Sequence, residues 1–348
     1  MSYYEQRLSE DTALLMREVA SLAQLVDQSL QNALRALATD DRGLAYQTVL
    51  EDGPINRLTE KVESESHRFM AKHLPSGGHL RRVSSIMRIA VLLERVGDYA
   101  STICRHAASM KKPLEGSFKR DVAAMGADAL QMYRQALDAF TKEDASLARG
   151  TMGFAEQVDR DFVNALAFLR DSVPEKGEVD DLFARLVIIR QLERVSDQAK
   201  NLCEETVFAI TGETKRRKPM EILVVGKTDD GATQLAAAIA ARLHAGKIAL
   251  STGGEKAADS VRPDIAAFLS EKGYEVADLQ PTDLDGLGRP LGSFKIIVSL
   301  DGPVAERVGA VPFECVALEW DLGDSSDVET CYRELAAKLD DLARVVRG

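Results

Sequence analysis

A repeated segment constrains the fold of this chain more than any other feature of its sequence. Residues 89–104 and 188–203 align at a constant offset. The two copies share Ile89 with Ile188, Leu93 with Leu192, Glu94 with Glu193, Arg95 with Arg194, Val96 with Val195, Asp98 with Asp197, Ala100 with Ala199 and Cys104 with Cys203. Such repetition indicates two related units, and helices with long apolar faces need each other because they are not stable alone.

Apolar residues recur at three- and four-residue intervals from about residue 5 to residue 210, which is the period of amphipathic helices. The pattern predicts helices at residues 6–38, 42–72, 79–110, 117–142, 145–170 and 178–210. The breaks between them are short, which favours antiparallel neighbours. We therefore predict an all-α N-terminal domain over residues 1–212. Its two repeats, at about 1–112 and 115–212, are each a three-helix unit.

The pattern changes after Gly212. Residues 213–219 are charged and lack apolar periodicity, so they are expected to form a linker. Short apolar runs at 222–225, 247–250 and 294–298 then alternate with helical patterns, the last of them at about 328–346. Strands that alternate with helices predict a small α/β domain with a parallel sheet over residues 220–348.

Composition excludes several classes of protein. A formal net charge of −11 argues against a nucleic-acid partner, because such proteins need basic surface. No apolar stretch approaches membrane-spanning length, so membrane insertion is not expected. The four cysteines are far apart and show no CxxC spacing, which fits neither a disulfide framework nor a zinc knuckle. A cytoplasmic location is expected.

The repeat places two acidic residues four positions apart on one helix face in each copy, Glu94 with Asp98 and Glu193 with Asp197. Like charges at this spacing repel, so a metal ion or a basic partner is one interpretation. The simpler interpretation is a solvated polar face with partial compensation from the adjacent arginines, Arg95 and Arg194. The residues alone leave both open.

Residues 93–98 and 192–201 resemble the duplicated E-R-x-G-D-x-x-x-N signature of the PhoU family, and the resemblance covers residues 1–212 in length, helix number and duplication. It implies two three-helix bundles, a homodimer, and iron or zinc bound by acids of the signature helices and of the preceding helices. The matching upstream positions are Asp52 with Asn56, and Glu156 with Asp159. The implied metal ligands are Asp52, Glu94, Asp98, Asp159, Glu193 and Asp197.

Departures from the signature affect the first copy more than the second. Thr102 stands where the signature has asparagine, and Asn56 replaces an acid, whereas the second copy differs by Ser196 in place of glycine. The resemblance implies a non-enzymatic regulator of phosphate uptake and phosphate-starvation signalling. Such a protein is an adaptor between the ATPase subunit of the phosphate ABC transporter and a sensor histidine kinase. The helical part contains no nucleophile, base or cofactor motif.

The C-terminal part is similar in the order of its segments to low-molecular-weight protein tyrosine phosphatases and arsenate reductases. That family needs a cysteine nucleophile and an arginine in a C-x5-R loop. Gly226 and Ala232 stand at the matching positions, and Asp324 stands where the family has its leaving-group acid. We therefore expect a pseudo-phosphatase that serves protein contact or packing. The alternative is a phosphatase or arsenate reductase that uses a non-standard cysteine, Cys315 or Cys331.

Residual anion binding by the loop ranks behind protein contact. Backbone N–H groups at the start of a helix bind anions, and the loop leads into such a helix. Asp229 and Asp230 oppose this, because they put negative charge where a phosphate would sit.

Overall fold

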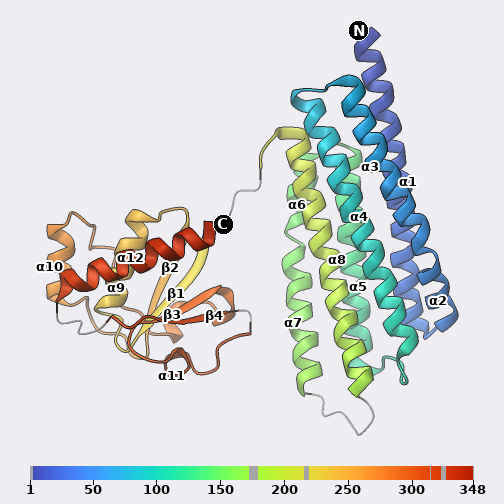
Figure 1. Cartoon of the computed structure of the whole chain (residues 1–348). Coiled ribbons are helices and arrows are strands. Elements are labelled where there is room, and N and C mark those ends of the chain that lie inside the picture. Colours follow the sequence, from blue (N-terminus) through green and yellow to red (C-terminus); the bar gives the residue numbers. More distant parts are fainter. Residues whose placement is uncertain (1–2, 172–178, 215–218, 314, 323–326, 348) are drawn as a thin grey trace. The chain divides into compact units, whose positions relative to one another are not determined.

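The computed structural model describes residues 3–171, 179–214, 219–313, 315–322 and 327–347 (Figure 1). The chain divides into two compact units, Met1–Lys215 and Arg216–Gly348. The first is all-helical and the second contains a parallel sheet, so the predicted fold class is confirmed for both parts. The expected linker at 213–219 falls mostly outside the described residues.

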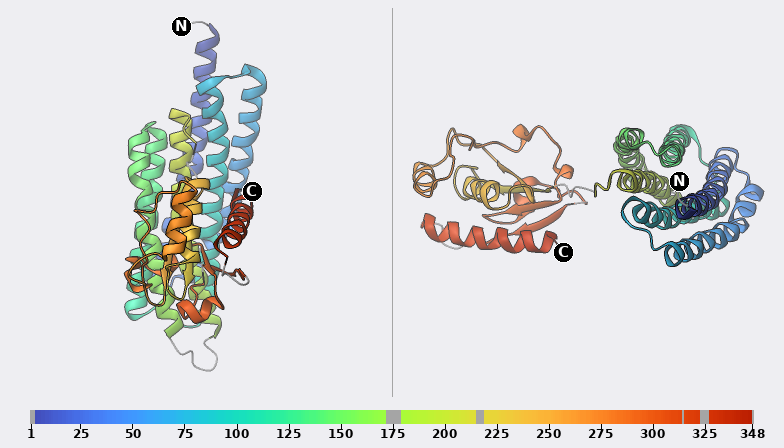
Figure 2. Two further views of the ribbon diagram at one scale, coloured as in Figure 1. Left: turned by 90° about the vertical axis from the view of Figure 1, so that its left-hand side faces the viewer. Right: turned by 90° about the horizontal axis from the view of Figure 1, so that it is seen from above.

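The helical unit contains eight helices in the described residues (Figure 2). They are α1 (Tyr3–Thr39), α2 (Arg42–Leu50), α3 (Asp52–His73), α4 (Gly77–Ser109), α5 (Gly116–Thr141), α6 (Ala145–Met152), α7 (Ala155–Asp171) and α8 (Val179–Thr211). None of these helices, nor any other in the described part of the chain, has the length and apolar character needed to cross a bilayer.

The prediction of six helices was wrong in number, because the second helix of each repeat is divided. The helix expected at 42–72 breaks at Glu51, where α2 ends and α3 begins. Pro54 lies in the first turn of α3, a position that tolerates its missing N–H, whereas the interior of a continuous helix does not. The helix expected at 145–170 breaks at Gly153 and Phe154.

The same turn precedes the divided helix in both repeats. Asp40 follows α1 with a φ of 53°, and Glu143 follows α5 with a φ of 55°. The next residue then caps a helix: the Asp41 carboxylate accepts from the Leu44 N–H, and Asp144 caps α6 in the same way. The pseudo-symmetry therefore extends to the turns, where the two sequences differ.

α4 and α8, which carry the repeated segment, pack against each other more extensively than any other two elements of the described chain. Seven of the shared apolar residues are fully buried: Ile89, Leu93, Ala100, Ile188, Leu192, Val195 and Ala199. Cys104 and Cys203 are also fully buried. Burial raises the pKa of the Cys104 thiol to about 11 and that of the Cys203 thiol to about 12. Most of the shared residues are therefore the central core of the unit.

The second unit is a four-stranded parallel sheet with the strand order β2-β1-β3-β4. Its elements are β1 (Met220–Gly226), α9 (Ala232–Leu243), β2 (Ile248–Gly254), α10 (Pro263–Glu271), the 3-10 turns η1 (Asp285–Leu287) and η2 (Leu291–Ser293), β3 (Ile296–Ser299), α11 (Val304–Val308), β4 (Val316–Glu319) and α12 (Val328–Arg347).

Both faces of this sheet are covered. Ile222 and Val224 of β1 pack with α9, α10 and α12, whereas Leu223 and Val225 pack with Phe294 and α11. β1 reads as an unbroken apolar run because it is buried on both sides. In open parallel sheets, ligands bind at the carboxyl ends of the strands, and here the loops after β1, β3 and β4 meet at that edge.

Candidate functional site

The first acidic face lies between α3 and α4 and consists of Asp52, Glu94 and Asp98. Asp52 is in the first turn of α3, and the other two lie one turn apart on α4. Burial raises the pKa of Glu94, and the charges of Asp98 and Asp52 raise it further, while Arg95 opposes them. Partial burial and the charge of Asp52 also raise the pKa of Asp98. The three carboxylates are therefore close enough to repel one another.

Gly97 allows α3 to approach α4 beside this face. A Cβ atom at Gly97 would lie 3.0 Å from Cδ1 of the buried Ile55. The equivalent Ser196 is fully buried, and its hydroxyl donates to the Glu193 carbonyl oxygen over 2.8 Å. The second copy therefore accommodates a side chain where the first requires glycine, which explains the departure from the signature at Ser196.

The second acidic face consists of Asp159 on α7 with Glu193 and Asp197 on α8. Burial raises the pKa of Glu193, and the charges of Asp197 and Asp159 add to the effect, although Arg190 and Arg194 oppose it. The Glu193 side chain is only 13% exposed. Its Oε1 accepts from Arg190 Nη1 at 3.2 Å, but its Oε2 is buried without a hydrogen-bond partner. Glu193 Oε2 is therefore removed from water without a hydrogen bond in the described residues that would compensate for the lost hydration.

The side chains of these two faces are of the chemical type that binds divalent cations. Carboxylate oxygens are suitable ligands for such ions, and the unmet Glu193 Oε2 is a group that a cation would satisfy. As the side chains stand, however, no three His, Cys, Asp or Glu residues in the described chain converge closely enough to hold a metal ion. Asn56 and Glu156, the other positions that the resemblance implies, are exposed. The six expected ligands thus form two groups of three that would need side-chain rotation to chelate.

Arg190 is the residue that sequence reasoning missed at this face. Arg194 lowers the pKa of Glu193 through its charge, as expected, and its guanidinium also lies over the Tyr99 ring of α4, 5.8 Å from the centroid. The direct ion pair with Glu193 is formed by Arg190. The signal was present in the spacing, because residues three apart are neighbours on a helix surface.

The loop from β1 to α9 is where the second unit would resemble a phosphatase. A Cβ atom at Gly226 would lie 3.0 Å from Thr233 Cγ2 and 3.8 Å from Oδ2 of Asp301. That carboxylate oxygen accepts from the Lys227 backbone N–H at 2.9 Å, and Oδ1 of Asp301 accepts from Arg307 Nε at 2.9 Å. A loop N–H of the kind that would bind an oxyanion is therefore already bonded to a carboxylate of the chain.

The Asp229 side chain holds the loop between β1 and α9 in place through hydrogen bonds to neighbouring segments. Its Oδ2 accepts from Thr282 N at 2.8 Å, from Gln234 Nε2 at 3.0 Å and from Thr252 Oγ1 at 3.1 Å. Burial raises its pKa, against the effect of these hydrogen bonds. Because a Cβ atom at Gly254 would lie 3.0 Å from the Asp229 backbone N, the loop can pack on β2 only over a glycine.

None of the cysteines lines the pocket at this loop. Cys331 on α12 is 4% exposed, and burial raises the pKa of its thiol. Cys315 Sγ donates to the Phe294 carbonyl oxygen at 3.0 Å on the other face of the sheet. Asp324 lies outside the described residues. No thiol of the described chain is therefore placed to attack a ligand bound here.

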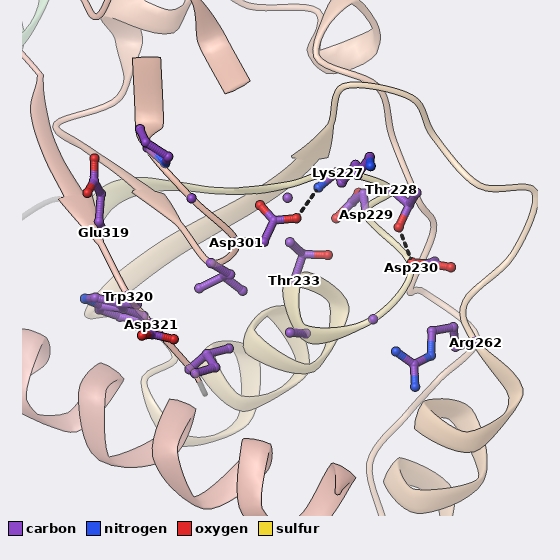
Figure 3. A pocket seen from close by; sticks show the side chains of 17 residues that line it. Lys227, Thr228, Asp229, Asp230, Thr233, Arg262, Asp301, Glu319, Trp320 and Asp321 are labelled. Carbon is purple, nitrogen blue, oxygen red and sulfur yellow. Dashed lines mark hydrogen bonds between the residues drawn. The ribbon is translucent and has the colours of Figure 1, made fainter. Parts of the chain in front are cut away.

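A pocket of about 710 Å³ opens at the carboxyl edge of the sheet (Figure 3). Its charged lining residues are Lys227, Asp229, Asp230, Arg262, Asp301, Glu319 and Asp321, and Trp320 lies among them. The sequence marked Asp229 and Asp230 as charges at the loop, but it did not identify Asp301 or the wall formed by residues 319–321. Their place follows β3 and β4, and β4 was not predicted because a strand of four residues carries too little pattern to identify it.

Comparison with known proteins supports the division of the chain. The family model described as "PhoU domain" matches residues 19–107 and 122–206. The phosphate-specific transport system accessory protein PhoU homologue of Pseudomonas aeruginosa is 29% identical over 214 residues, which cover 60% of this chain and 88% of that protein. The crystal structure of the phosphate transport system regulatory protein PhoU from Streptococcus pneumoniae is 30% identical, with a TM-score of 0.55, and covers 61% of this chain and 99% of its own.

The second unit has its own structural neighbour. An arsenate reductase in the phosphate-binding state aligns with 36% of this chain and 98% of its own, at 20% identity and a TM-score of 0.31.

Proposed function

Because this chain belongs to the PhoU domain family, we propose that it is a non-enzymatic regulator of phosphate transport. The observation that carries the proposal is the pair of family matches, which contain both acidic faces. The matched relatives are named as accessory or regulatory proteins of phosphate transport.

In detail, we propose a cytoplasmic homodimer that acts as an adaptor between the ATPase subunit of the phosphate ABC transporter and a sensor histidine kinase. It would hold phosphate-starvation signalling off when phosphate is plentiful. The acidic faces support a cationic occupant, because burial and mutual repulsion raise the pKa values of Glu94, Asp98 and Glu193. A divalent metal such as iron or zinc, or a basic surface of the partner, would remove that repulsion.

The metal proposal names Asp159, Glu193 and Asp197 at the second face, and Asp52, Glu94 and Asp98 at the first. In the Glu193→Gln/Asp197→Asn variant we expect the iron or zinc content of protein purified without chelator or metal-affinity tag to fall by about half. The metal-free variant should be more stable than the metal-free parent at pH 7, because an acid with a raised pKa destabilises the fold when ionised. We expect a gain of about 1 kcal/mol, or ~2–4 °C in Tm.

The matched control neutralises the exposed α5 acids Asp121 and Asp128, so it changes the net charge equally. It should leave metal content unchanged and alter stability by less than about 0.5 kcal/mol. If parent and variant are both free of metal, the acids are partner-facing charge. If the metal-free variant is less stable than the parent, the repulsion that we infer at this face is wrong.

Regulation is tested in a bacterium that lacks its own PhoU protein and carries a phosphate-starvation reporter. The full chain should restore repression in phosphate-rich medium and should retain the transporter ATPase subunit in a pull-down. The Glu193→Gln/Asp197→Asn variant should lose most of both effects, roughly tenfold for a lost charge-assisted contact. The Asp121→Asn/Asp128→Asn control should behave as the parent. Equal activity of both variants would remove the second acidic face from the mechanism.

The enzymatic alternative is a phosphatase or arsenate reductase with a non-standard cysteine. Nothing in the pocket favours it, since Cys315 and Cys331 do not line the loop. The test is an assay of the purified protein with an aryl phosphate and with arsenate. Activity that is lost in Cys315→Ser or Cys331→Ser would establish the enzymatic alternative for this unit.

A further inference from the structure

We propose that a second copy of this chain docks antiparallel on the exposed side of α7, so that Arg170 of each copy reaches Asp159 of the other. The inference deepens the proposed homodimer, on which it rests, by naming its interface and the cation that meets the second acidic face. It depends on an exposed apolar pair, on the charges at the two ends of that pair, and on the contrast with the same helix in the first repeat.

The exposed side of α7 carries a short stripe of apolar and charged residues. Val163 is 54% exposed and Leu166 is 38% exposed. Asp159 lies one turn before this pair and Arg170 lies one turn after it, and both are exposed. Residues at intervals of three and four share a side of a helix, so one side of α7 presents an acid, two apolar residues and a base in that order.

α8 lies beside α7 and extends the apolar area (Figure 1). Phe183 is 61% exposed and lies about two turns before Arg190, on the same side of α8. This side of α8 adjoins α7, since the Arg190 guanidinium lies 5.3 Å from the centroid of the Phe162 ring. The flank formed by α7 and α8 therefore exposes several large apolar side chains next to the second acidic face, which is typical of a surface that binds another protein.

The first repeat shows that this position in the fold does not require apolar side chains. α3 is the counterpart of α7, and buried residues of the two helices align at a constant offset: Ile55 with Val158, Thr59 with Phe162, and Val62 with Ala165. At that offset, the exposed Glu60 and Glu63 stand where α7 has Val163 and Leu166. Glutamate suits a helix side that faces only water, so the apolar pair of the second repeat indicates a partner for this side of α7.

The order of charges identifies that partner as a second copy of the chain. A two-fold axis that crosses α7 midway between Val163 and Leu166 brings each of them against the other in the second copy. The same axis brings Asp159 opposite Arg170, because both pairs are centred on the same point of the helix. A parallel arrangement would place acid on acid and base on base, so the charges select the antiparallel one. The acidic first turn of each helix, with Glu156, then lies beside the basic last turn of the other.

The second copy would also supply the donor that the second acidic face lacks. Glu193 Oε2 is buried without a hydrogen-bond partner in the described residues, and the charge of Asp159 is close enough to raise the pKa of Glu193. A guanidinium carries five N–H donors, so one arginine can bond to both carboxylates. Arg170 is free to turn toward them, because its side chain is 76% exposed and its ion pair with the exposed Asp171 is of the kind that contributes little.

Reversal of the two charges tests the pairing. The association is measured by sedimentation velocity of the full-length protein over a range of concentrations. Arg170→Glu and Asp159→Arg should each raise the dimer dissociation constant roughly tenfold or more, because each puts like charges together at two symmetry-related points. The double variant Asp159→Arg/Arg170→Glu should regain most of the parent affinity. That recovery would have to come from a second copy, because the two residues are about 16 Å apart along their own helix.

A second pair of variants tests the apolar part of the interface. Val163→Glu/Leu166→Glu introduces the glutamates that the first repeat has at these positions, so it should abolish dimerisation without lowering the helix signal at 222 nm. Tyr46→Glu/Leu50→Glu is the matched control, because it adds the same charge to exposed apolar residues of α2. The control should dimerise as the parent does.

The possible failures are distinguishable. A monomer at every concentration would overturn both this interface and the homodimer, and would indicate a basic helix of another protein as the occupant. A dimer that all the variants leave intact would overturn this interface alone. If the double variant does not regain affinity, the two charges do not meet. Repression of the phosphate-starvation reporter is measured separately, so a failure of the proposed regulation would appear there and not in the sedimentation.

Discussion

Replacing Leu192 with alanine is expected to lower the free energy of unfolding of the helical unit by about 3 kcal/mol. Leu192 is fully buried on α8, in the helix pair that forms the centre of the core. Deletion of a buried leucine side chain loses transfer free energy and leaves a cavity, which together cost about 2–5 kcal/mol. Leu93, its equivalent on α4, is equally buried, so Leu93→Ala should cost a similar amount.

The measurement is urea unfolding of the full chain followed by circular dichroism at 222 nm. Leu50→Ala is the matched control, because this leucine of α2 is 81% exposed, and it should change stability by less than about 0.5 kcal/mol. If Leu192→Ala is no more destabilising than Leu50→Ala, the central position of α8 in the core is wrong. A large difference between Leu93→Ala and Leu192→Ala would show that the two repeats contribute unequally to the core.

Replacing Asp229 with alanine is expected to destabilise the second unit by about 2–4 kcal/mol. The change removes the buried acceptor of Thr282 N and Thr252 Oγ1. It also removes one acceptor of Gln234 Nε2, which keeps the Gln280 carbonyl oxygen. Each buried donor that loses its partner costs about 1–3 kcal/mol, and partial relaxation reduces the sum. Trp320 fluorescence reports on this unit, since the unit contains the only tryptophan. Asp229→Asn is the shape-matched control, because its amide oxygen can still accept from all three donors.

The difference in stability between the Asp229→Asn variant and the parent should also depend on pH. The pKa of Asp229 is raised above 3.8 by burial, so the folded state favours the protonated form. The resulting stabilisation is complete at low pH and is lost as the pH rises through the folded-state pKa. The stability of Asp229→Asn relative to the parent should therefore increase between about pH 4 and pH 7. A relative stability that falls over this range would show that the three hydrogen bonds outweigh burial.

The sequence predicted the long helices well, because their apolar period extends over several turns. The expected ends of the helix at 79–110 agree with α4 (Gly77–Ser109) to within two residues. It predicted the divided helices poorly, because α2 and α6 have nine and eight residues, too few for periodicity to distinguish them from a continuation of the next helix. β4 was missed for a related reason, since this strand of four residues is mostly exposed.

The candidate sites show the same limit. Spacing along one helix was enough to pair Glu193 with Asp197, and the resemblance supplied Asp159 from α7, which the structure brings close enough to affect Glu193. Nothing local indicated that Asp301 would bond to the Lys227 N–H, because these residues are 74 positions apart. The sequence could identify what the loop lacks, a cysteine and an arginine, but not which groups occupy its edge.

The sequence by itself determined the duplicated helical unit, the parallel α/β unit and the position of each repeated acid on its helix, because helix and strand periods fix the neighbours of a residue within one element. Only the tertiary structure decided which charges meet across elements. Arg190 rather than Arg194 pairs with Glu193, and the acids after β3 and β4 converge on the loop after β1. Contacts between residues on different elements depend on how those elements pack, and the spacing of residues along the chain does not determine it.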